Sequence, residues 1–276
     1  MTVAWVNSES VSASRSFEAV HAGLTVAMIQ TPRVDLKTCN AEEPIAAVVA
    51  CNDDRFDHLP VLDPQSGETR ISGLLHLTDH GGDAPRDGLV RDHCTALTED
   101  HVIGENASIL DFVVRADTCP CRLVFSGARV SGLVTLSDLQ KLPVRAALFA
   151  LITGFEMTMT ETIRRTHASS DDWLPYLSQN RRTKIDAETA RSRETDGFVD
   201  SLLFTQFCDK RDIIAKSMSL GGARSNLHTR FRKIENLRNA LAHANSYAAT
   251  PEDARQVCAT VRSLLELQKM IGGRAA

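Results

Sequence analysis

The sequence predicts an α+β protein in which two β-α-β-β-α repeats precede an all-α bundle of four to five helices. The heptapeptide GLLHLTD at residues 73–79 returns as GLVTLSD at 132–138, a period of 59 residues. After Pro143 the spacing of apolar residues changes to the helical period of 3.6. Residues 1–143 have a charge of −9, from 11 Lys/Arg and 20 Asp/Glu, and residues 144–276 have +5, from 20 and 15. We therefore expect two domains, of which only the second suits a polyanion.

Composition narrows the class of protein. The 276 residues suffice for two ordinary cores, and the 43% hydrophobic and 24% charged content is typical of a soluble globular chain. The longest apolar run, AALFALITGF, is too short to span a bilayer, and no signal peptide is evident. The seven cysteines form no CxxC pair, which argues against zinc; Cys119-Pro-Cys121 comes nearest to such a motif. We expect a cytoplasmic protein with no membrane contact and no bound metal.

Each repeat is predicted to arrange short strands around a helix. The segments LPVLD and ISGLL in the first repeat, and RLVF and VSGLV in the second, are apolar, β-branched and bounded by Gly or Asp. EEPIAAVVACN and ASILDFVVRA supply the intervening helices. Two such units can bury their sheets against one another. We place them at residues 22–82 and 83–142, after an N-terminal extension at 1–21.

These repeats resemble a tandem pair of CBS domains, through LPVLD…SGLLHLTD and RLVF…SGLVTLSDL. The resemblance implies a cleft that holds an adenine nucleotide (ATP, ADP or AMP) against a G-x-x-[ST]-x-x-D segment. Gly132, Thr135 and Asp138 match this pattern fully. In the first repeat Gly73 and Asp79 match, but a histidine at position 76 replaces the Ser/Thr.

The expected nucleotide contacts are Thr135, Asp138 and Asp79. A carboxylate can accept from two vicinal ribose hydroxyls, and a hydroxyl can donate to a phosphate oxygen. The alternative for Asp138, which is followed by Leu139, is to cap the helix that follows it, a common task for Asp. His76, Asp79 and His80 together suggest a metal, but the repeat already explains that segment.

Residues 143–276 are predicted to be helical. A helix of roughly 20 residues carries one apolar stripe: Val144, Ala147, Leu148, Leu151, Ile152, Phe155, Met159 and Ile163. A short helix begins at Ser170 and ends near Leu177. Residues 179–197 are a charged loop or a frayed helix, whose five Arg and Lys residues are solvated surface or contact RNA.

Three further helices complete the predicted bundle. One covers about 198–218 and ends before Gly221-Gly222. The next includes residues 227–243. The last begins at Thr250-Pro251, with acidic residues in its first turn and with Val257, Val261, Leu264 and Leu265 facing inward.

The segment LRNALAH, at 237–243, places polar residues away from the core. On a helical wheel, the residues of one apolar stripe are Leu227, Phe231, Ile234, Leu237 and Leu241. Asn239 and His243 point almost directly away from it, and Arg238 lies at its edge. These three residues are solvated, or they hydrogen-bond a neighbouring loop, or they form a site.

A helical bundle with Arg-Asn-x-x-x-His near the end of its penultimate helix resembles the HEPN domain of ribonucleases. The resemblance implies that Arg238, Asn239 and His243 are catalytic and that two such faces meet in a homodimer. The chemistry agrees with RNA as substrate, because the 2′-hydroxyl is a nucleophile within the RNA itself. A histidine can shuttle its proton, and an arginine can bind the phosphate as charge develops.

One branch of that family has a tyrosine two residues after the histidine. In this chain Asn245 occupies that position, and Tyr247 follows two residues later. The tyrosine belongs to the nucleotidylation-linked motif of that branch, so we do not transfer the role of that motif to this chain. We expect a metal-independent endoribonuclease that is regulated by adenine nucleotide, with a role in stress or phage defence. The alternative is a non-catalytic adaptor that senses nucleotide or dimerises. A cofactor enzyme has little support, since no Gly-rich phosphate loop, HExxH or GxSxG segment occurs.

Overall fold

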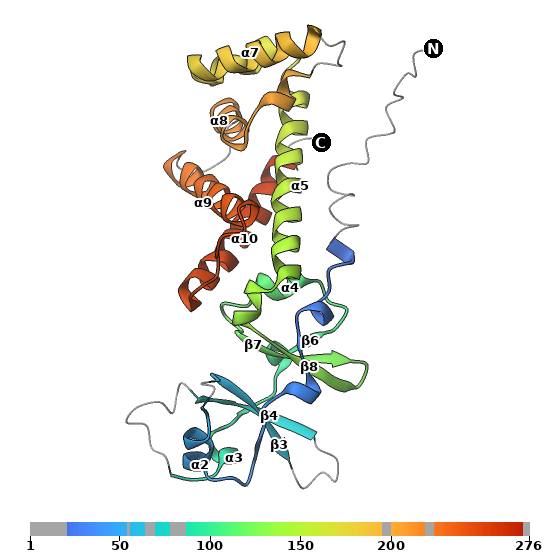
Figure 1. Ribbon diagram of the computed structural model, residues 1–276, viewed down its shortest axis with the longest axis vertical. Helices are drawn as coiled ribbons and strands as arrows, with labels where there is room; N and C mark the ends of the chain where they lie inside the picture. The colour runs from blue at the N-terminus through green and yellow to red at the C-terminus, as the bar shows by residue number, and fades with distance from the viewer. Residues whose placement is uncertain are drawn as a thin grey trace. The chain divides into compact units, whose positions relative to one another are not determined.

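The chain divides into two compact units, Thr25–Lys141 and Leu142–Ala276. Figure 1 shows the computed structural model. It describes residues 21–53, 56–63, 70–77, 87–194, 200–218 and 224–272. Asp79, His80 and the Gly221-Gly222 pair therefore lie outside the described residues.

The Thr25–Lys141 unit contains two four-stranded sheets. The strands of the first, in spatial order, are β2 (Cys39–Asn40), β3 (His58–Asp63), β4 (Arg70–His76) and β5 (Thr95–Ala96). The strands of the second are β6 (Val102–Gly104), β7 (Cys121–Ser126), β8 (Arg129–Thr135) and β1 (Thr31–Pro32). The accompanying helices are short: η1 (Val26–Met28), η2 (Arg33–Asp35), α2 (Ile45–Ala50), α3 (Val90–His93), η5 (Glu99–His101), α4 (Ile109–Val113) and η6 (Leu136–Gln140).

The two sheets repeat one another. Each has a parallel pair, β2 with β3 and β6 with β7, followed by an antiparallel hairpin. The register shifts between Val61 and Leu62 in one hairpin and between Val124 and Phe125 in the other, at the same place in the repeat. The predicted α+β class and internal repeat are confirmed.

The repeats also exchange strands, which the sequence analysis did not predict. β5 lies in the second predicted repeat and pairs with β4 of the first, whereas β1 lies in the first predicted repeat and pairs with β8 of the second. The exchange explains the glycine in each heptapeptide. A Cβ on Gly73 would lie 2.9 Å from the carbonyl oxygen of Thr95 on β5, and one on Gly132 would collide with that of Thr31 on β1.

The sheets share one apolar core. Its buried residues come from both sheets: Ile71 and Leu74 on β4, and Cys121, Leu123 and Leu133 on β7 and β8. A second cluster joins α2 and α3 to the other face of the first sheet, through residues that include Ile45, Leu59 and Val90. Face-to-face packing of the two repeats is therefore confirmed.

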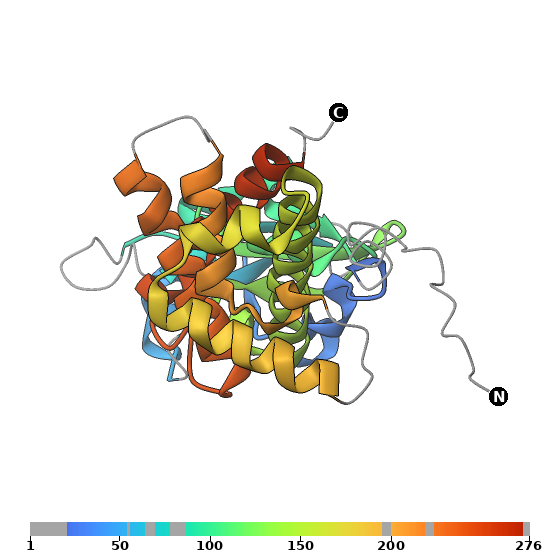
Figure 2. The same ribbon diagram turned by 90° about the horizontal axis from the view of Figure 1, so that it is seen from above.

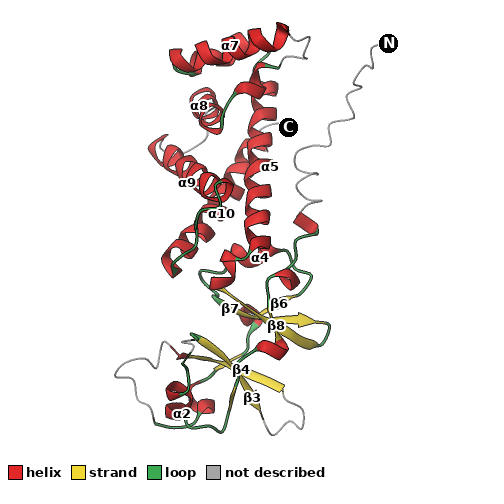
Figure 3. Cartoon of the chain, viewed as in Figure 1, coloured by secondary structure: helices red, strands yellow, loops and turns green. Residues whose placement is uncertain are grey.

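The Leu142–Ala276 unit is helical, as predicted (Figure 3). Its helices are α5 (Leu142–Thr166), α6 (Ser170–Trp173), η7 (Leu174–Tyr176), α7 (Gln179–Glu194), η8 (Ser201–Phe204), α8 (Phe207–Ser217), α9 (Arg224–Ala242) and α10 (Pro251–Gly272). All eight residues of the predicted α5 stripe are buried. The rings of Phe155 on α5, Phe207 on α8 and Phe231 on α9 meet with centroids 6.0–6.5 Å apart. Figure 2 shows α5 nearly end-on with α10 beside it.

One helix prediction needs correction, and one pair of alternatives is decided. The single helix expected at 198–218 is broken, because Thr205 and Gln206 are extended and separate η8 from α8. The Asp209 carboxylate accepts from the backbone N–H of Gln206 at 2.8 Å and so starts a new helix there. Of the two alternatives for residues 179–197, the helix is found over Gln179–Glu194.

The polar helix α7 is fixed at its first turn. Ile185 is its only buried residue among those described, so apolar burial contributes little. The Arg181 guanidinium instead donates to both oxygens of the buried Asp209 carboxylate, at 2.5–3.1 Å. The Arg182 guanidinium donates to the carbonyls of Leu177 and Pro175, at 2.9 and 2.6 Å.

The apolar run AALFALITGF is part of a longer helix. The run lies within α5, whose 25 residues are long and apolar enough to cross a membrane by length and composition alone. In the structure 44% of the most apolar window is buried inside the protein, against α8, α9 and α10. The core helix of a helical bundle meets the same criteria.

Alkylation will distinguish the cysteines, because the thiolate is the reactive form. Burial raises the pKa of Cys39 and of Cys121 to about 12. The negative charge of Glu43 raises the pKa of Cys39 further, and that of Asp138 raises the pKa of Cys121. Cys51, by contrast, is exposed. We expect iodoacetamide at pH 8 to modify Cys51 quickly and to spare Cys39 and Cys121 until denaturant is added, as followed by mass spectrometry. Equal labelling rates for Cys51 and Cys121 in the native protein would contradict this.

Candidate active site

Helix α9 presents the predicted polar face to solvent. The five residues of its apolar stripe, Leu227, Phe231, Ile234, Leu237 and Leu241, are all buried. Asn239 and His243 are exposed, and Arg238 is half-buried at the edge of the stripe. The helix thus places the three side chains as the helical wheel predicts.

Arg238 is oriented by α5. Its Nε lies 3.5 Å from Oε2 of Glu156, and its Nη1 donates to Oδ1 of Asn239 at 3.4 Å. The other oxygen of Glu156 is 3.1 Å from Nζ of Lys210, which is only 6% exposed and also donates to the Thr205 carbonyl. Because Lys210 already neutralises the carboxylate, Arg238 retains positive charge available to a phosphate.

The end of α9 is fixed by a second arginine. The Arg145 guanidinium donates to the carbonyls of Ala240, Leu241 and Asn245, at 3.2, 2.9 and 2.6 Å. A cation at a helix C-terminus satisfies free carbonyls and interacts favourably with the helix dipole. Arg145 therefore holds the last turn of α9, which carries His243.

Ala244 ends α9 in a left-handed conformation, with φ 54°. The N–H of Asn245 donates to the carbonyl of Ala240 at 3.0 Å, which is the Schellman pattern that usually has glycine at this position. We expect Ala244→Gly to raise the free energy of unfolding by about 1 kcal/mol, because glycine adopts this φ without strain. Urea denaturation measures it. The matched control Ala242→Gly, inside the helix, should lower stability; a loss from both changes would contradict the argument.

The α9 face carries a cation that the sequence analysis did not single out. Arg232, Asn236, Asn239 and His243 are four, three and four residues apart and so follow one stripe of the helix. Arg232 is exposed, and its side chain has no hydrogen-bond or ion-pair partner among the residues that the structure describes. Asn239, Asn236 and Arg232 precede His243 by four, seven and eleven residues, and this helical spacing could have identified Arg232 from the sequence.

In the sheet unit, Thr135 and Asp138 lie together. The Asp138 Oδ2 accepts from the Thr135 N–H at 2.5 Å and lies 3.2 Å from the Thr135 hydroxyl. The other Asp138 oxygen is 2.8 Å from Nζ of Lys141, and the side chain is buried. Asp138 thus lies inside η6 and closes a capping box with Thr135, whereas the alternative considered for it was to cap a helix that follows it. A ribose would have to share or displace these contacts.

The residues considered as metal ligands lie in the sheet unit. His76 stacks on His58, with ring centroids 4.4 Å apart, and Asp79 lies outside the described residues. Cys121 is buried and Cys119 is half-buried. Within the described ranges, no group of three or more His, Cys, Asp or Glu side chains is arranged to hold a metal ion.

Comparisons with known proteins concern the sheet unit. No family model matches the chain, and no curated protein matches it. The CBS domain of a bacterial CNNM/CorC family Mg²⁺ transporter in complex with ATP is 21% identical, with a TM-score of 0.36, over 46% of this chain and 92% of that one. A CBS-pair protein of Arabidopsis thaliana is 19% identical, with a TM-score of 0.35, over 45% and 94%. CBS domains of a Streptococcus pneumoniae transcriptional regulator are 15% identical, with a TM-score of 0.35, over 42% and 95%.

These similarities lie in the N-terminal part of the chain. TM-scores below 0.5 at such identities establish neither a shared ligand nor a shared activity. The resemblance of the helical unit to HEPN domains stays a prediction from its sequence.

Proposed function

We propose that the chain is a metal-independent endoribonuclease that acts as a homodimer. One observation carries the proposal: Arg238, Asn239 and the exposed His243 lie together at the end of α9. Two residues of α5 hold that end in place, Glu156 through Arg238 and Arg145 through the backbone carbonyls. A solvated helix end would need neither the Glu156 contact to Arg238 nor three hydrogen bonds from Arg145. Such anchoring is what a site requires of its supporting residues.

Each side chain has a role in the proposed reaction. The His243 imidazole takes the proton from a 2′-hydroxyl, which then attacks the adjacent phosphorus and expels the 5′-oxygen; a protonated imidazole returns a proton to that leaving oxygen. Arg238 donates to the phosphate oxygens as negative charge develops. Asn239 orients Arg238 through its Oδ1, and the exposed Arg232 contacts a neighbouring phosphate.

A homodimer supplies the second imidazole. One chain carries a single motif, and cleavage needs one group to accept a proton and another to donate one. On α5, Leu142 is 74% exposed, and Phe149 and Met157 are each 46% exposed. Their spacing places them along one side of the helix, next to Glu156, which contacts Arg238. Two copies related by a twofold axis would cover this stripe and bring the motifs together.

Incubation of the purified chain with total RNA tests the proposal. We expect cleavage in the presence of EDTA, at a rate that excess Mg²⁺ does not raise. A strict requirement for Mg²⁺, or intact RNA under all conditions, would leave the adaptor as the better description. An adaptor would still use the α5 stripe to dimerise, but it has no need of the His243 imidazole.

We further propose that the sheet unit binds an adenine nucleotide beside Thr135 and Asp138. The specific observation is the buried Asp138 carboxylate, which lies next to the Thr135 hydroxyl and the Lys141 ammonium. The Ser137 hydroxyl is 2.8 Å from that of Thr135. A ribose hydroxyl can replace the Thr135 hydroxyl at the carboxylate, which frees Thr135 to donate to phosphate. Lys141 adds a positive charge for the phosphates.

Calorimetry with ATP, ADP and AMP tests this second proposal. We expect at least one of them to bind, and Asp138→Ala to weaken binding by about 1–3 kcal/mol, the range for a lost hydrogen bond to a charged group. Asp111→Ala is the matched control, because Asp111 caps α4 in the same manner, through the N–H of Ser108. No heat with any of the three nucleotides would contradict it, as would equal losses from both variants.

A further inference from the structure

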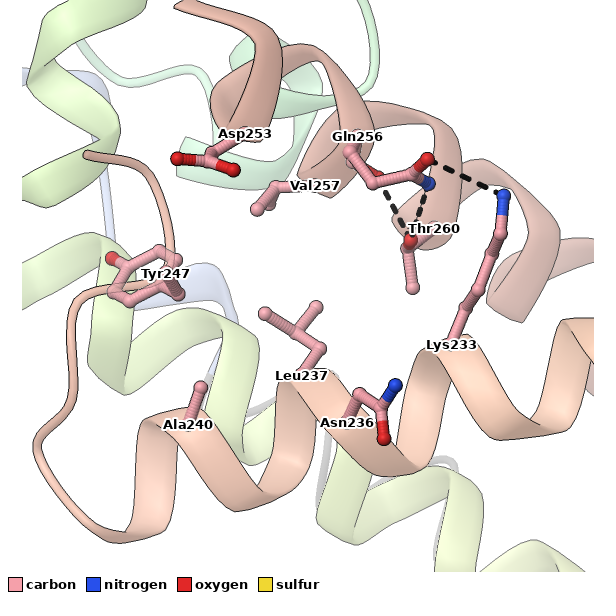
Figure 4. Close-up of a pocket in the computed structure, with 9 residues that line it drawn as sticks. All are labelled: Lys233, Asn236, Leu237, Ala240, Tyr247, Asp253, Gln256, Val257 and Thr260. Carbon is pink, nitrogen blue, oxygen red and sulfur yellow. Dashed lines mark hydrogen bonds between the residues drawn. The ribbon is translucent and has the colours of Figure 1, made fainter. Parts of the chain in front are cut away.

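A cavity of about 280 Å³ lies between α9, α10 and the loop that joins them. Figure 4 shows its nine lining residues. Four are on α9 and four on α10, and Tyr247 from the loop closes one end. Leu237 and Val257 point toward one another across the gap and give it an apolar middle.

The two side-chain amides of the cavity are weakly engaged, whereas Asp253 and Thr260 make short hydrogen bonds, to the Thr250 hydroxyl at 2.8 Å and to the Gln256 carbonyl at 2.7 Å. The Gln256 side chain accepts from Lys233 and donates to Thr260, both at 3.3 Å, which is long for a hydrogen bond. The Asn236 amide has no hydrogen-bond partner within the described part of the chain. Two amides can therefore exchange partners with a ligand at little cost, and each offers both a donor and an acceptor.

The cavity lies about two helical turns from the proposed active site, along α9. Asn236 is seven residues before His243, so the two side chains lie on the same face of α9. The distance between them along the helix axis is about 10 Å. One nucleotide can bridge that distance, with its base at Asn236 and its phosphate at the Arg238 and His243 end.

We infer that this cavity binds one nucleobase of the RNA strand next to the cleaved bond. Apolar walls, an aromatic ring and amides that both donate and accept are the features by which proteins bind unstacked bases. The inference rests on the proposed function, since it places the base relative to His243. It adds a determinant of where the RNA is cut.

Tyr247 suits the end wall of such a site. The guanidinium carbon of Arg145 lies over its ring, 4.9 Å from the centroid, and so fixes the ring. Burial raises the pKa of Tyr247 to about 12, against an opposing effect of Arg145, so the phenol stays neutral at working pH. A fixed, uncharged ring presents an apolar wall to a base without repelling the phosphates of the strand.

The test measures binding separately from cleavage. Short RNA strands with 2′-O-methyl groups lack the nucleophile, so fluorescence anisotropy reports their binding to the full chain. We expect a strand with one abasic position to bind about tenfold more weakly than its parent, within the range for loss of one stacked base. Asn236→Ala should reduce the difference in affinity among the four bases about 3- to 10-fold, the effect of one hydrogen bond. The matched control Asn226→Ala, exposed on the same helix, should leave that difference unchanged.

The outcomes separate this inference from the proposed function. If the protein cleaves unmodified RNA but binds abasic and complete strands equally, the base site is overturned and the ribonuclease stands. The base site is also overturned if Asn236→Ala and Asn226→Ala have the same effect. If strands bind with a base preference that Asn236→Ala removes, yet unmodified RNA stays intact, the base site stands and the ribonuclease fails.

Discussion

His243→Ala is expected to slow RNA cleavage by about 10²–10⁴-fold, the usual contribution of a general acid–base group. The imidazole is exposed on α9, outside the buried stripe, so its removal leaves the core unchanged. Surface substitutions of this kind usually change stability by less than about 0.5 kcal/mol. Initial rates on a fluorescent RNA, measured in EDTA, give the change in activity, and circular dichroism gives the fold.

His228→Ala is the matched control for that variant. His228 is exposed on the same helix, but it lies four turns before His243 and outside the proposed site. The His228→Ala variant should cleave RNA at the rate of the parent protein. If His243→Ala also cleaves at that rate, or if both variants lose activity equally, the catalytic role of His243 is wrong and the helical unit is better described as a dimerisation module.

The face of α9 could be predicted from the sequence because its information is local. A period of 3.6 residues determines which side chains are buried, and the five buried residues of the apolar stripe, from Leu227 to Leu241, follow that period. The position of Glu156 could not be predicted, since it lies 82 residues before Arg238 and reaches it only through tertiary packing. The same holds for Arg145, whose three carbonyl partners belong to a helix end that no periodicity identifies.

In the sheet unit, too, a local sequence pattern predicted the repeat but not the contacts between its strands. The repeated heptapeptide predicted two equivalent units, but β1 and β5 have only two residues each, too few for a readable alternation. Their exchange is determined by backbone contacts at Gly73 and Gly132. Asp138 matched a nucleotide-binding pattern, and the structure shows that it also closes a capping box with Thr135, because both roles place a carboxylate three residues after a hydroxyl.

Glu156→Gln is expected to lower the free energy of unfolding by about 3 kcal/mol. The reason is Lys210: the residue is 6% exposed, and its ammonium lies 3.1 Å from the Glu156 carboxylate. Removing one partner of a buried pair leaves an uncompensated charge, at a cost of about 3–5 kcal/mol, and Glu156 is partly exposed, which favours the lower end. Arg238 adds little to this loss, since it is half-buried and 3.5 Å away, where a solvated ion pair contributes about 0–1 kcal/mol.

Urea denaturation measures the change, with Glu161→Gln as the control. Glu161 is exposed on the same helix, so its substitution should change stability by less than about 0.5 kcal/mol. Adding Lys210→Met to Glu156→Gln should recover most of the lost stability, because an apolar side chain of similar volume removes the unpaired charge. Equal effects of Glu156→Gln and Glu161→Gln would show that water already solvates Lys210. The carboxylate would then be too weakly held to orient Arg238, and the site would depend on Arg145 alone for its geometry.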